Sequence, residues 1–290
     1  MKNHTHDASV KGLNRAKPYQ LVLFPLNNGA TNVYFVLILS YVAQFGSSIL
    51  HLGIFASLMV TVMRVCDAIT DPIIGAMMDR TSTRIGKFRP FMILGSVVMA
   101  LSVIALYILL PFIPETMMPL RYVGFTVVYF IWVLGYTFQT IFNTVGSLLG
   151  MGIMQFLIPL IKAMYDVKDA AGNIITSGYA NPMVYRIITP IGIAISVLLT
   201  ILAIIGIAEK DRPEFYGLGG QQEKVKISEY VQIIKANKPM QRLMVAGAGC
   251  KLALAIATNT TVLLALYGIV MGNYNSLYLP MMVLGYVCAV

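Results

Sequence analysis

Long apolar stretches separated by short polar ones organise most of the chain. Lys, Arg, Asp and Glu are absent from five of these stretches, which are 18–63, 90–114, 122–161, 187–208 and 252–290. The first holds 46 residues. As one helix it would be about 69 Å long, whereas the hydrocarbon core of a bilayer is about 30 Å thick. The chain must therefore fold back within it.

Turn-forming residues divide the three longest stretches, at 46–48 with Gly53, at 143–147 and at 272–275. The first division predicts spans at about 21–44 and 52–76. Taken together, the pattern predicts an all-α polytopic membrane protein. It would have seven full spans and an eighth that stops at Val290.

The scarcity of charge excludes the main alternatives to a membrane protein. Of 290 residues, 58% are apolar and only 11% are charged, against roughly 25% charged in an ordinary globular domain. A soluble enzyme and a disordered chain are both excluded by these values. The lipid bilayer is therefore the expected surroundings of most of the chain.

Basic residues indicate how the spans are oriented. With the N-terminus in the cytoplasm, 15 of the 21 Lys and Arg fall in cytoplasmic segments. Four fall in outer segments, namely Arg121, Lys162, Lys168 and Arg186. This asymmetry follows the positive-inside rule. The net charge of +9 is explained by topology, and nothing indicates a nucleic-acid surface.

The same pattern predicts the organisation of the chain. The segments are a cytoplasmic N-terminus (1–20), a six-helix half (21–208), a cytoplasmic central loop (209–241) and the start of a second half (242–290). Helical spacing of apolar residues predicts a short amphipathic helix in the central loop, and a solvated linker is the alternative. No metal-ligand spacing, phosphate-binding loop or catalytic set is found. The sequence therefore predicts neither an enzyme nor a cofactor.

Three ionisable residues in the second span carry the candidate chemistry. Arg64, Asp67 and Asp71 have the spacing i, i+3, i+7 and share one helix face. Each costs at least about 2.5–3.5 kcal/mol within a membrane. The two carboxylates would share a proton or recruit a cation, beside the Thr70 hydroxyl and a carbonyl freed by Pro72. The alternative is an Arg64–Asp67 ion pair, with Asp71 capping or facing the cytoplasmic end.

The residues around this cluster resemble a known family. Asp-Ala-Ile-Thr-Asp-Pro at 67–72 is followed by Asp-Arg-Thr-Ser-Thr-Arg-Ile-Gly-Lys-Phe-Arg-Pro at 79–90. Together they resemble the glycoside–pentoside–hexuronide:cation symporters, a family of the major facilitator superfamily that includes the melibiose permease. The segment 267–274 is also similar. The resemblance implies a fold of twelve helices in two halves and sites for a sugar and a coupling cation.

The resemblance also implies roles for individual residues. The cation site would consist of Asp67, Thr70, Asp71 and Thr137. The sugar pocket would involve Thr31, Asn32, Tyr34, Trp132, Tyr136, Thr140 and Lys251. Residues of conformational importance would be Arg64, Asp79, Arg80, Arg84, Lys87 and Arg89. For Trp132, and likewise for Asn32 and Tyr34, the alternative is an anchor at the membrane interface. For Lys251 it is a side chain that snorkels to the cytoplasm.

The chain departs from the family at several points. Thr31 and Thr140 stand where galactoside carriers have acidic residues, so the sugar is not predicted. The chain stops before helices nine to twelve, and truncation is the expectation. The function expected is symport of a sugar or glycoside with Na⁺ or H⁺, with Li⁺ as a further candidate, in the bacterial inner membrane. The alternative is a truncated, non-transporting remnant or a sensor-like half.

Overall fold

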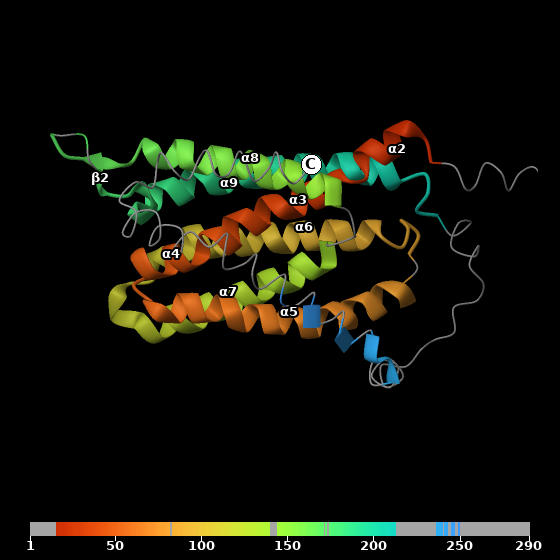
Figure 1. Cartoon of the computed structure of the whole chain (residues 1–290), viewed down its shortest axis with the longest axis horizontal. Coiled ribbons are helices and arrows are strands. Elements are labelled where there is room, and N and C mark those ends of the chain that lie inside the picture. The colour runs from red at the N-terminus through yellow and green to blue at the C-terminus, as the bar shows by residue number, and fades with distance from the viewer. Residues whose placement is uncertain are drawn as a thin grey trace, which may run out of the picture.

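The computed structural model describes residues 16–212, apart from 82, 140–143, 171 and 173, and scattered positions between 236 and 249. Most of the predicted central loop and most of the predicted second half lie outside the described residues. The described part is a bundle of helices that run along a common long axis, with a small hairpin at one end (Figure 1).

Each of the six spans predicted before the central loop corresponds to helical structure. The first consists of α2 (Pro18–Leu23), α3 (Leu26–Phe35), the π-helical segment η1 (Val36–Ser40) and α4 (Val42–Ser48). The next four contain α5 (Ile54–Arg80), α6 (Arg89–Ile104) with η2 (Ala105–Leu109) and η3 (Leu110–Phe112), η4 (Glu115–Met117) with α7 (Met118–Gln139), and α8 (Thr144–Ala163). After α8 come the antiparallel strands β1 (Val167–Lys168) and β2 (Ile174–Thr176), then η5 (Gly178–Ala180) and α9 (Pro182–Ile207).

Within the described residues, four helical stretches are long and apolar enough to cross a membrane. They are Pro18–Ser48, Arg89–Phe112, Glu115–Gln139 and Pro182–Ile207. Helix α5 has 27 residues but contains the ionisable cluster, and α8 contributes the shorter apolar stretch Leu149–Ala163. The surface of the bundle exposes apolar side chains such as Leu101, Leu160 and Ile205, which lipid would cover. The predicted class, an all-α membrane protein, is confirmed.

Arg121 does not lie in an outer loop, as the charge pattern predicted, but inside α7. Its side chain is buried and donates to the Ile113 carbonyl oxygen at 2.9 and 2.6 Å and to the Leu50 carbonyl oxygen at 3.1 Å. These two carbonyls belong to the ends of neighbouring spans, where a helix leaves its last acceptors without partners. A buried guanidinium is stable here because it satisfies those acceptors.

Helix α8 is also longer than the sequence predicted. It begins at Thr144, within the predicted turn at 143–147, and it includes Lys162 in its last turn. The Lys162 ammonium can be buried because Asp166, four residues further along the chain and beyond the end of α8, pairs with it, with Nζ and Oδ2 2.7 Å apart. A paired charge can enter a helix where an unpaired one would end the apolar stretch.

Glycines allow two pairs of helices to approach closely. A Cβ atom on Gly150 of α8 would lie 1.9 Å from the carbonyl oxygen of Gly29 in α3, and one on Gly146 would lie 1.8 Å from the Pro25 oxygen. A Cβ atom on Gly95 of α6 would similarly lie 2.7 Å from a carbonyl oxygen of α7. Membrane helices pack through such small residues because lipid offers little hydrophobic drive between helices.

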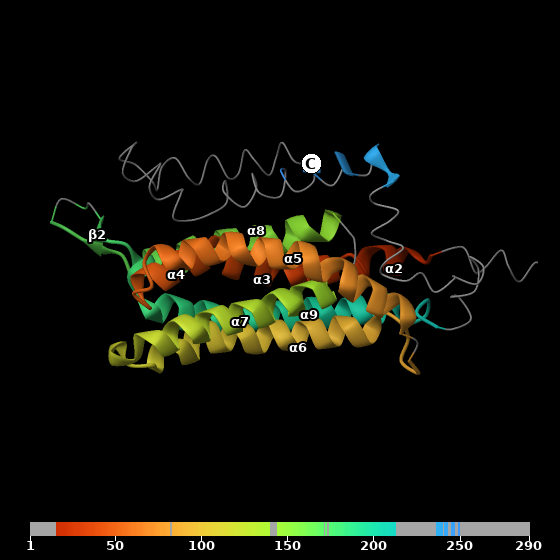
Figure 2. The same ribbon diagram turned by 90° about the horizontal axis from the view of Figure 1, so that it is seen from below.

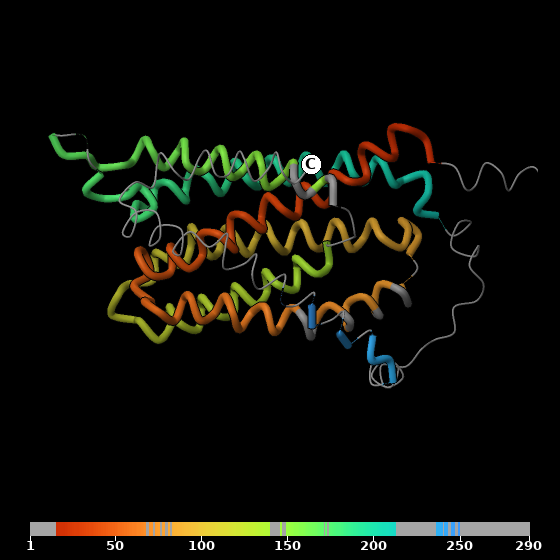
Figure 3. The backbone as a smooth tube through the Cα atoms, viewed as in Figure 1, coloured from red at the N-terminus to blue at the C-terminus, as the bar shows by residue number. Residues whose placement is uncertain are grey.

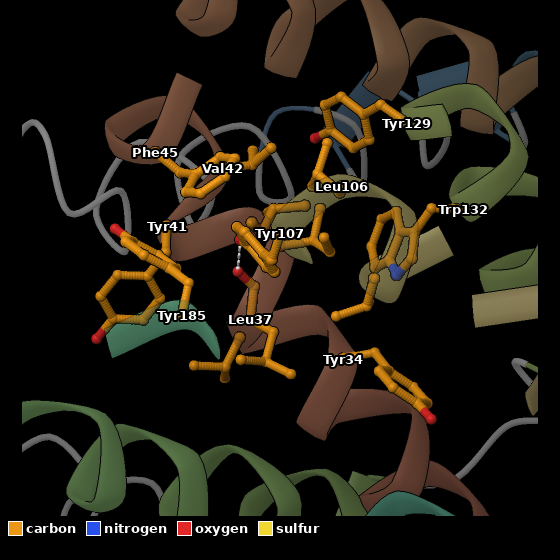
Figure 4. Packing of buried hydrophobic residues seen from close by; sticks show 14 of the residues in the cluster. Tyr34, Leu37, Tyr41, Val42, Phe45, Leu106, Tyr107, Tyr129, Trp132 and Tyr185 are labelled. Atoms are coloured by element: carbon orange, nitrogen blue, oxygen red, sulfur yellow. Dashed lines mark hydrogen bonds between the residues drawn. The ribbon is translucent and has the colours of Figure 1, made fainter. Parts of the chain in front are cut away.

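The core between the helices is rich in tyrosine and phenylalanine (Figure 4). Phe45 lies edge-on to Tyr107 with ring centroids 4.7 Å apart, and Tyr107 stacks on Tyr185 at 5.0 Å. The Tyr107 hydroxyl, in the π-helical segment η2, donates to the carbonyl of Leu37 in the π-helical segment η1. Two local departures from α-helix therefore contact each other in the centre of the bundle.

The tube in Figure 3 shows the chain passing repeatedly from one end of the bundle to the other. In Figures 1 and 2, the start of α2, the end of α5, the start of α6 and the end of α9 lie at the same end. This is the end that the positive-inside rule predicts to face the cytoplasm.

Candidate cation and sugar site

Asp67 is more deeply buried than Arg64 and Asp71, the two other ionisable residues of the predicted cluster on α5. It is only 4% exposed, and its two carboxylate oxygens have different partners. Oδ2 lies 3.1 Å from Nη1 of Arg64 on the same helix. Oδ1 lies 3.3 Å from the Thr137 hydroxyl on α7, whose single hydrogen is shared between this oxygen and the Val133 carbonyl at 3.1 Å. The carboxylate therefore joins α5 to α7 in the interior of the bundle.

The Arg64–Asp67 ion pair, which the sequence left open as an alternative, is present. The pair is monodentate, because only Nη1 of Arg64 contacts the carboxylate. Nη2 is buried and has no hydrogen-bond partner among the described residues. The guanidinium carbon lies 5.2 Å from the centre of the Phe35 ring, a distance at which a cation is attracted to the aromatic face.

Thr70 and Asp71 are less deeply placed. Both are partly buried, and the Thr70 hydroxyl donates to the backbone carbonyl of Asp67 at 3.2 Å. The hydrogen of that hydroxyl is thus used within α5, although its oxygen lone pairs are still able to accept. The side chain of Pro72 lies outside the described residues.

Aromatic side chains of α3 and α7 adjoin the ion pair. Trp132 stacks on Tyr136 with ring centroids 5.5 Å apart, and Tyr136 lies 6.0 Å from the Phe35 ring. Trp132 is 2% exposed, so the alternative of an anchor at the membrane interface is wrong. Its indole Nε1–H is buried without an acceptor among the described residues. Figure 4 shows Trp132 and Tyr34 inside the bundle.

The predicted sugar residues of the first span are buried, and two of them form hydrogen bonds within their own helix. Thr31 is buried and donates to the Asn27 carbonyl at 3.0 Å. Asn32 donates to the Asn28 carbonyl at 2.7 Å. Both polar groups thus satisfy their own helix, while Tyr34 is fully buried. Thr140 and Lys251 lie outside the described residues.

A family model described as MFS/sugar transport protein matches residues 28–145. The putative glycoside/cation symporter YagG of Escherichia coli (strain K12) is 46% identical over 63 residues, which are 22% of this chain and 13% of that protein. The lactose permease of Lactobacillus delbrueckii subsp. bulgaricus is 26% identical over 136 residues, which are 40% of this chain and 22% of that protein.

The predicted resemblance to the cation-coupled sugar symporters is confirmed. A further relative, the uncharacterized symporter YnaJ of Bacillus subtilis (strain 168), is 35% identical over 68 residues, 23% of this chain and 15% of that protein. Each match thus spans less than a quarter of the relative's length. The family-model match includes α5 and α7, the two helices that carry Asp67 and Thr137.

The loop between α5 and α6 contains the residues predicted to matter for conformational change. Thr83 and Gly86 pair through their backbones, and the Thr83 hydroxyl donates to the Gly86 carbonyl at 2.6 Å. Arg84 is exposed, whereas Lys87 and Arg89 are partly buried. The side chains of Asp79 and Arg80, at the end of α5, lie outside the described residues.

Asp211, which no pattern in the sequence indicated, is the partner of this loop. Its side chain is fully buried and accepts from the backbone N–H groups of Lys87 at 2.7 Å, Phe88 at 3.1 Å and Arg89 at 3.0 Å. Arg89 also donates from Nε to the carboxylate at 3.3 Å and from Nη2 to the Asp211 carbonyl at 2.9 Å. The sequence gives little indication of this role for Asp211, because acidic residues that follow an apolar stretch are common.

Glu209, two residues earlier, contacts the start of the first span. Its carboxylate lies 2.9 Å from the Lys17 ammonium and accepts from the Tyr19 hydroxyl at 2.9 Å and from Gln20 Nε2 at 3.0 Å. The hydrogen bond from Lys17 lowers the pKa of Glu209, and the same bond raises the pKa of Lys17.

A polar cluster inside the bundle was also missed. Asn27 of α3 donates to the Gln139 backbone carbonyl at 2.7 Å, and the Gln139 side chain donates to the Thr200 hydroxyl of α9 at 2.9 Å. All three residues are buried. Uncharged polar residues within apolar stretches were the available signal, but nothing in the pattern shows which of them meet. The cluster ties the first, fourth and sixth spans together.

Proposed function

We propose that this protein carries a sugar or glycoside together with Na⁺ or H⁺ across the bacterial inner membrane, with its N-terminus in the cytoplasm. The observation that carries the proposal is the buried Asp67 carboxylate, which contacts Thr137 across two helices within the stretch matched by the sugar-transport family model. The substrate is moved without covalent change, so the protein is not an enzyme.

The contacts of Asp67 support a cation site. Carboxylate and hydroxyl oxygens are ligands suited to hard cations, and Oδ1 of Asp67 lies 3.3 Å from the Thr137 hydroxyl oxygen. Thr70 and Asp71 follow on the same helix. Arg64 acts as the counter-ion of Asp67 in the structure. A bound cation or proton would take over that neutralising role, because a low-dielectric interior disfavours two positive charges beside one carboxylate.

The aromatic residues support a sugar site beside the cation site. Trp132 and Tyr136 are stacked on α7, next to Phe35. The indole N–H of Trp132 lacks an acceptor among the described residues, and a sugar hydroxyl would supply one. Binding of both ligands would then allow the carrier to rock between outward-open and inward-open states.

The experiment is to replace Asp67 with Asn in the complete protein and measure sugar uptake into membrane vesicles, with and without Na⁺ and with and without a proton gradient. We expect uptake to lose its dependence on the cation. Asp169→Asn, an exposed acid of the outer loop, is the matched control and should keep that dependence. Uptake by Asp67→Asn that is still driven by the cation would contradict the proposal.

The intrinsic fluorescence of the protein gives a second readout. Trp132 is the single tryptophan of the chain, so its emission reports directly on the proposed sugar site. A folded sample in which no sugar changes this emission, and which takes up none, would favour the alternative of a non-transporting membrane protein.

A further inference from the structure

Helix α6 begins without a cap of its own. Its N-cap residue is Phe88, which has no side-chain acceptor, and no side-chain cap is formed there. The first N–H groups of any α-helix lack partners within the helix and need acceptors from elsewhere. In this chain the acceptor is the carboxylate of Asp211, more than 120 residues away in sequence. A negative charge at this position also interacts favourably with the helix dipole.

The fit between Asp211 and the loop is close. Gly86 has a φ of +125°, a region that residues with a side chain rarely adopt, and a Cβ atom there would lie 2.1 Å from Oδ2 of Asp211. Gly86 is therefore needed twice, once for the backbone conformation and once for the space that the carboxylate occupies. The contact therefore depends on both residues: on the carboxylate of Asp211 and on the absence of a side chain at Gly86.

Besides α6, the segment 209–211 also contacts the ends of α9 and α2. Asp211 follows the last residue of α9 by four positions, and its backbone N–H donates to the Ile207 carbonyl at 2.9 Å. Glu209, between them, contacts Lys17 at the start of α2. Residues 209–211, which we name the cytoplasmic clasp, thus connect the ends of the first, third and sixth spans at the end of the bundle seen in Figure 1.

We propose that Asp211 is a positioning residue of the transport cycle: through the cytoplasmic clasp it makes the third and sixth spans move as one body. This inference rests on the proposed function. A carrier that rocks around a central site transmits motion only when the helices of each half move together. Asp67 lies thirteen residues before the end of α5, about 20 Å of helix from the loop. Loosening the clasp therefore changes the rate of rocking and leaves ligand binding intact.

The test uses Asp211→Asn and Gly86→Ala, which disturb one contact from its two sides. The complete protein is used throughout. Binding of Na⁺ and of sugar is measured by Trp132 fluorescence, and uptake rate is measured in vesicles. Binding constants should stay within about twofold of the wild type, while the uptake rate falls at least about tenfold, since one hydrogen bond to a charge is worth that much. The double variant should be no slower than the slower single variant, because both remove the same contact.

The controls match the two changes. Asp169→Asn removes an exposed acid, and Gly172→Ala changes a glycine with a φ of +86° that has nothing within 4 Å of the added Cβ. Both should transport like the wild type. If Asp211→Asn does not fold, Arg89→Lys keeps the charge and the backbone contacts and removes only the guanidinium bonds. We expect it to show the same separation of rate from binding, with at least about a threefold slower rate.

The possible outcomes separate the two proposals. Wild-type uptake rates in the folded variants, or binding constants that weaken in parallel with the rates, would overturn the role of Asp211 and leave the proposed function standing. A wild-type protein whose Trp132 responds to neither cation nor sugar, and which takes up no sugar, would overturn both.

Discussion

Replacing Asp166 with Asn should destabilise the protein more than almost any surface change. Asp166 and Lys162 form an ion pair of 2.7 Å whose side chains are only 2% and 5% exposed. The other oxygen of Asp166 accepts from the Gly178 N–H at 2.7 Å. The pair therefore connects the end of α8 to η5, the short helix that precedes α9. In Asp166→Asn the Lys162 charge loses its carboxylate while it remains buried.

The magnitude follows from the burial of the pair. Removing one partner of a buried ion pair costs about 3–5 kcal/mol, because the other charge stays desolvated. Asn keeps an oxygen that can accept from Gly178, so that hydrogen bond need not be lost. The ammonium of Lys162 also lies 5.5 Å from the Tyr179 ring, which offsets part of the loss. We therefore expect a loss of about 3 kcal/mol in the free energy of unfolding.

The assay is equilibrium unfolding in mixed detergent micelles, followed by circular dichroism. Lys162→Met in the Asp166→Asn background removes the buried positive charge and should recover at least about half of the loss. Lys168→Met, an exposed base of the same loop, serves as a control and should change stability by less than about 0.5 kcal/mol. A loss below about 1 kcal/mol for Asp166→Asn, or a double variant less stable than either single one, would refute the argument.

Two further predictions concern the ion pairs of Arg64 and Glu209. Arg64→Gln should tighten Na⁺ binding at least about tenfold, as measured by Trp132 fluorescence, because it removes a positive charge beside the Asp67 carboxylate. Unchanged or weaker binding in the folded variant would contradict this. The control is Arg186→Gln, which removes an exposed Arg that lies over the Phe112 ring. For Glu209, the lowered pKa means that its pairing with Lys17 stabilises the protein above pH 4.5 and is lost as the pH falls through the lowered value. The raised pKa of Lys17 likewise means that its contribution is present below pH 10.5 and is lost as the pH rises through the raised value. The difference in melting temperature between the wild type and Lys17→Gln should therefore shrink in acid, and a difference that is constant from neutral pH to well below pH 4.5 would contradict the assignment.

The helices could be predicted from the sequence because the transfer of a segment into lipid depends mainly on its own composition. The errors lie where a charge is buried at a helix end. Arg121 and Lys162 were expected outside the spans, yet both lie within helices because carbonyl groups and Asp166 pair with them. Such partners are supplied by neighbouring segments, so a charge count along the chain cannot include them.

The candidate site was predictable only where its geometry is local. Arg64 and Asp67 are three residues apart on one helix, and their ion pair is among the alternatives that this spacing allows. The contact of Asp67 with Thr137 was suggested by the resemblance to a family and not by any spacing. Asp211 was not predicted, because most of its hydrogen-bond donors are backbone N–H groups, and every residue except proline has such a group whatever its side chain.

The sequence by itself determined that this is a helical membrane protein, where its first six spans lie approximately, and that one helix carries an unusual group of charges. These properties follow from composition and from the period of a single helix. Only the tertiary structure decided which group from a distant part of the chain pairs with each of these polar groups: Thr137 with Asp67, Thr200 with Gln139, and Asp211 with the start of α6. In lipid, helices are matched by close packing and by hydrogen bonds between them, and those depend on shapes that exist only once the bundle has formed.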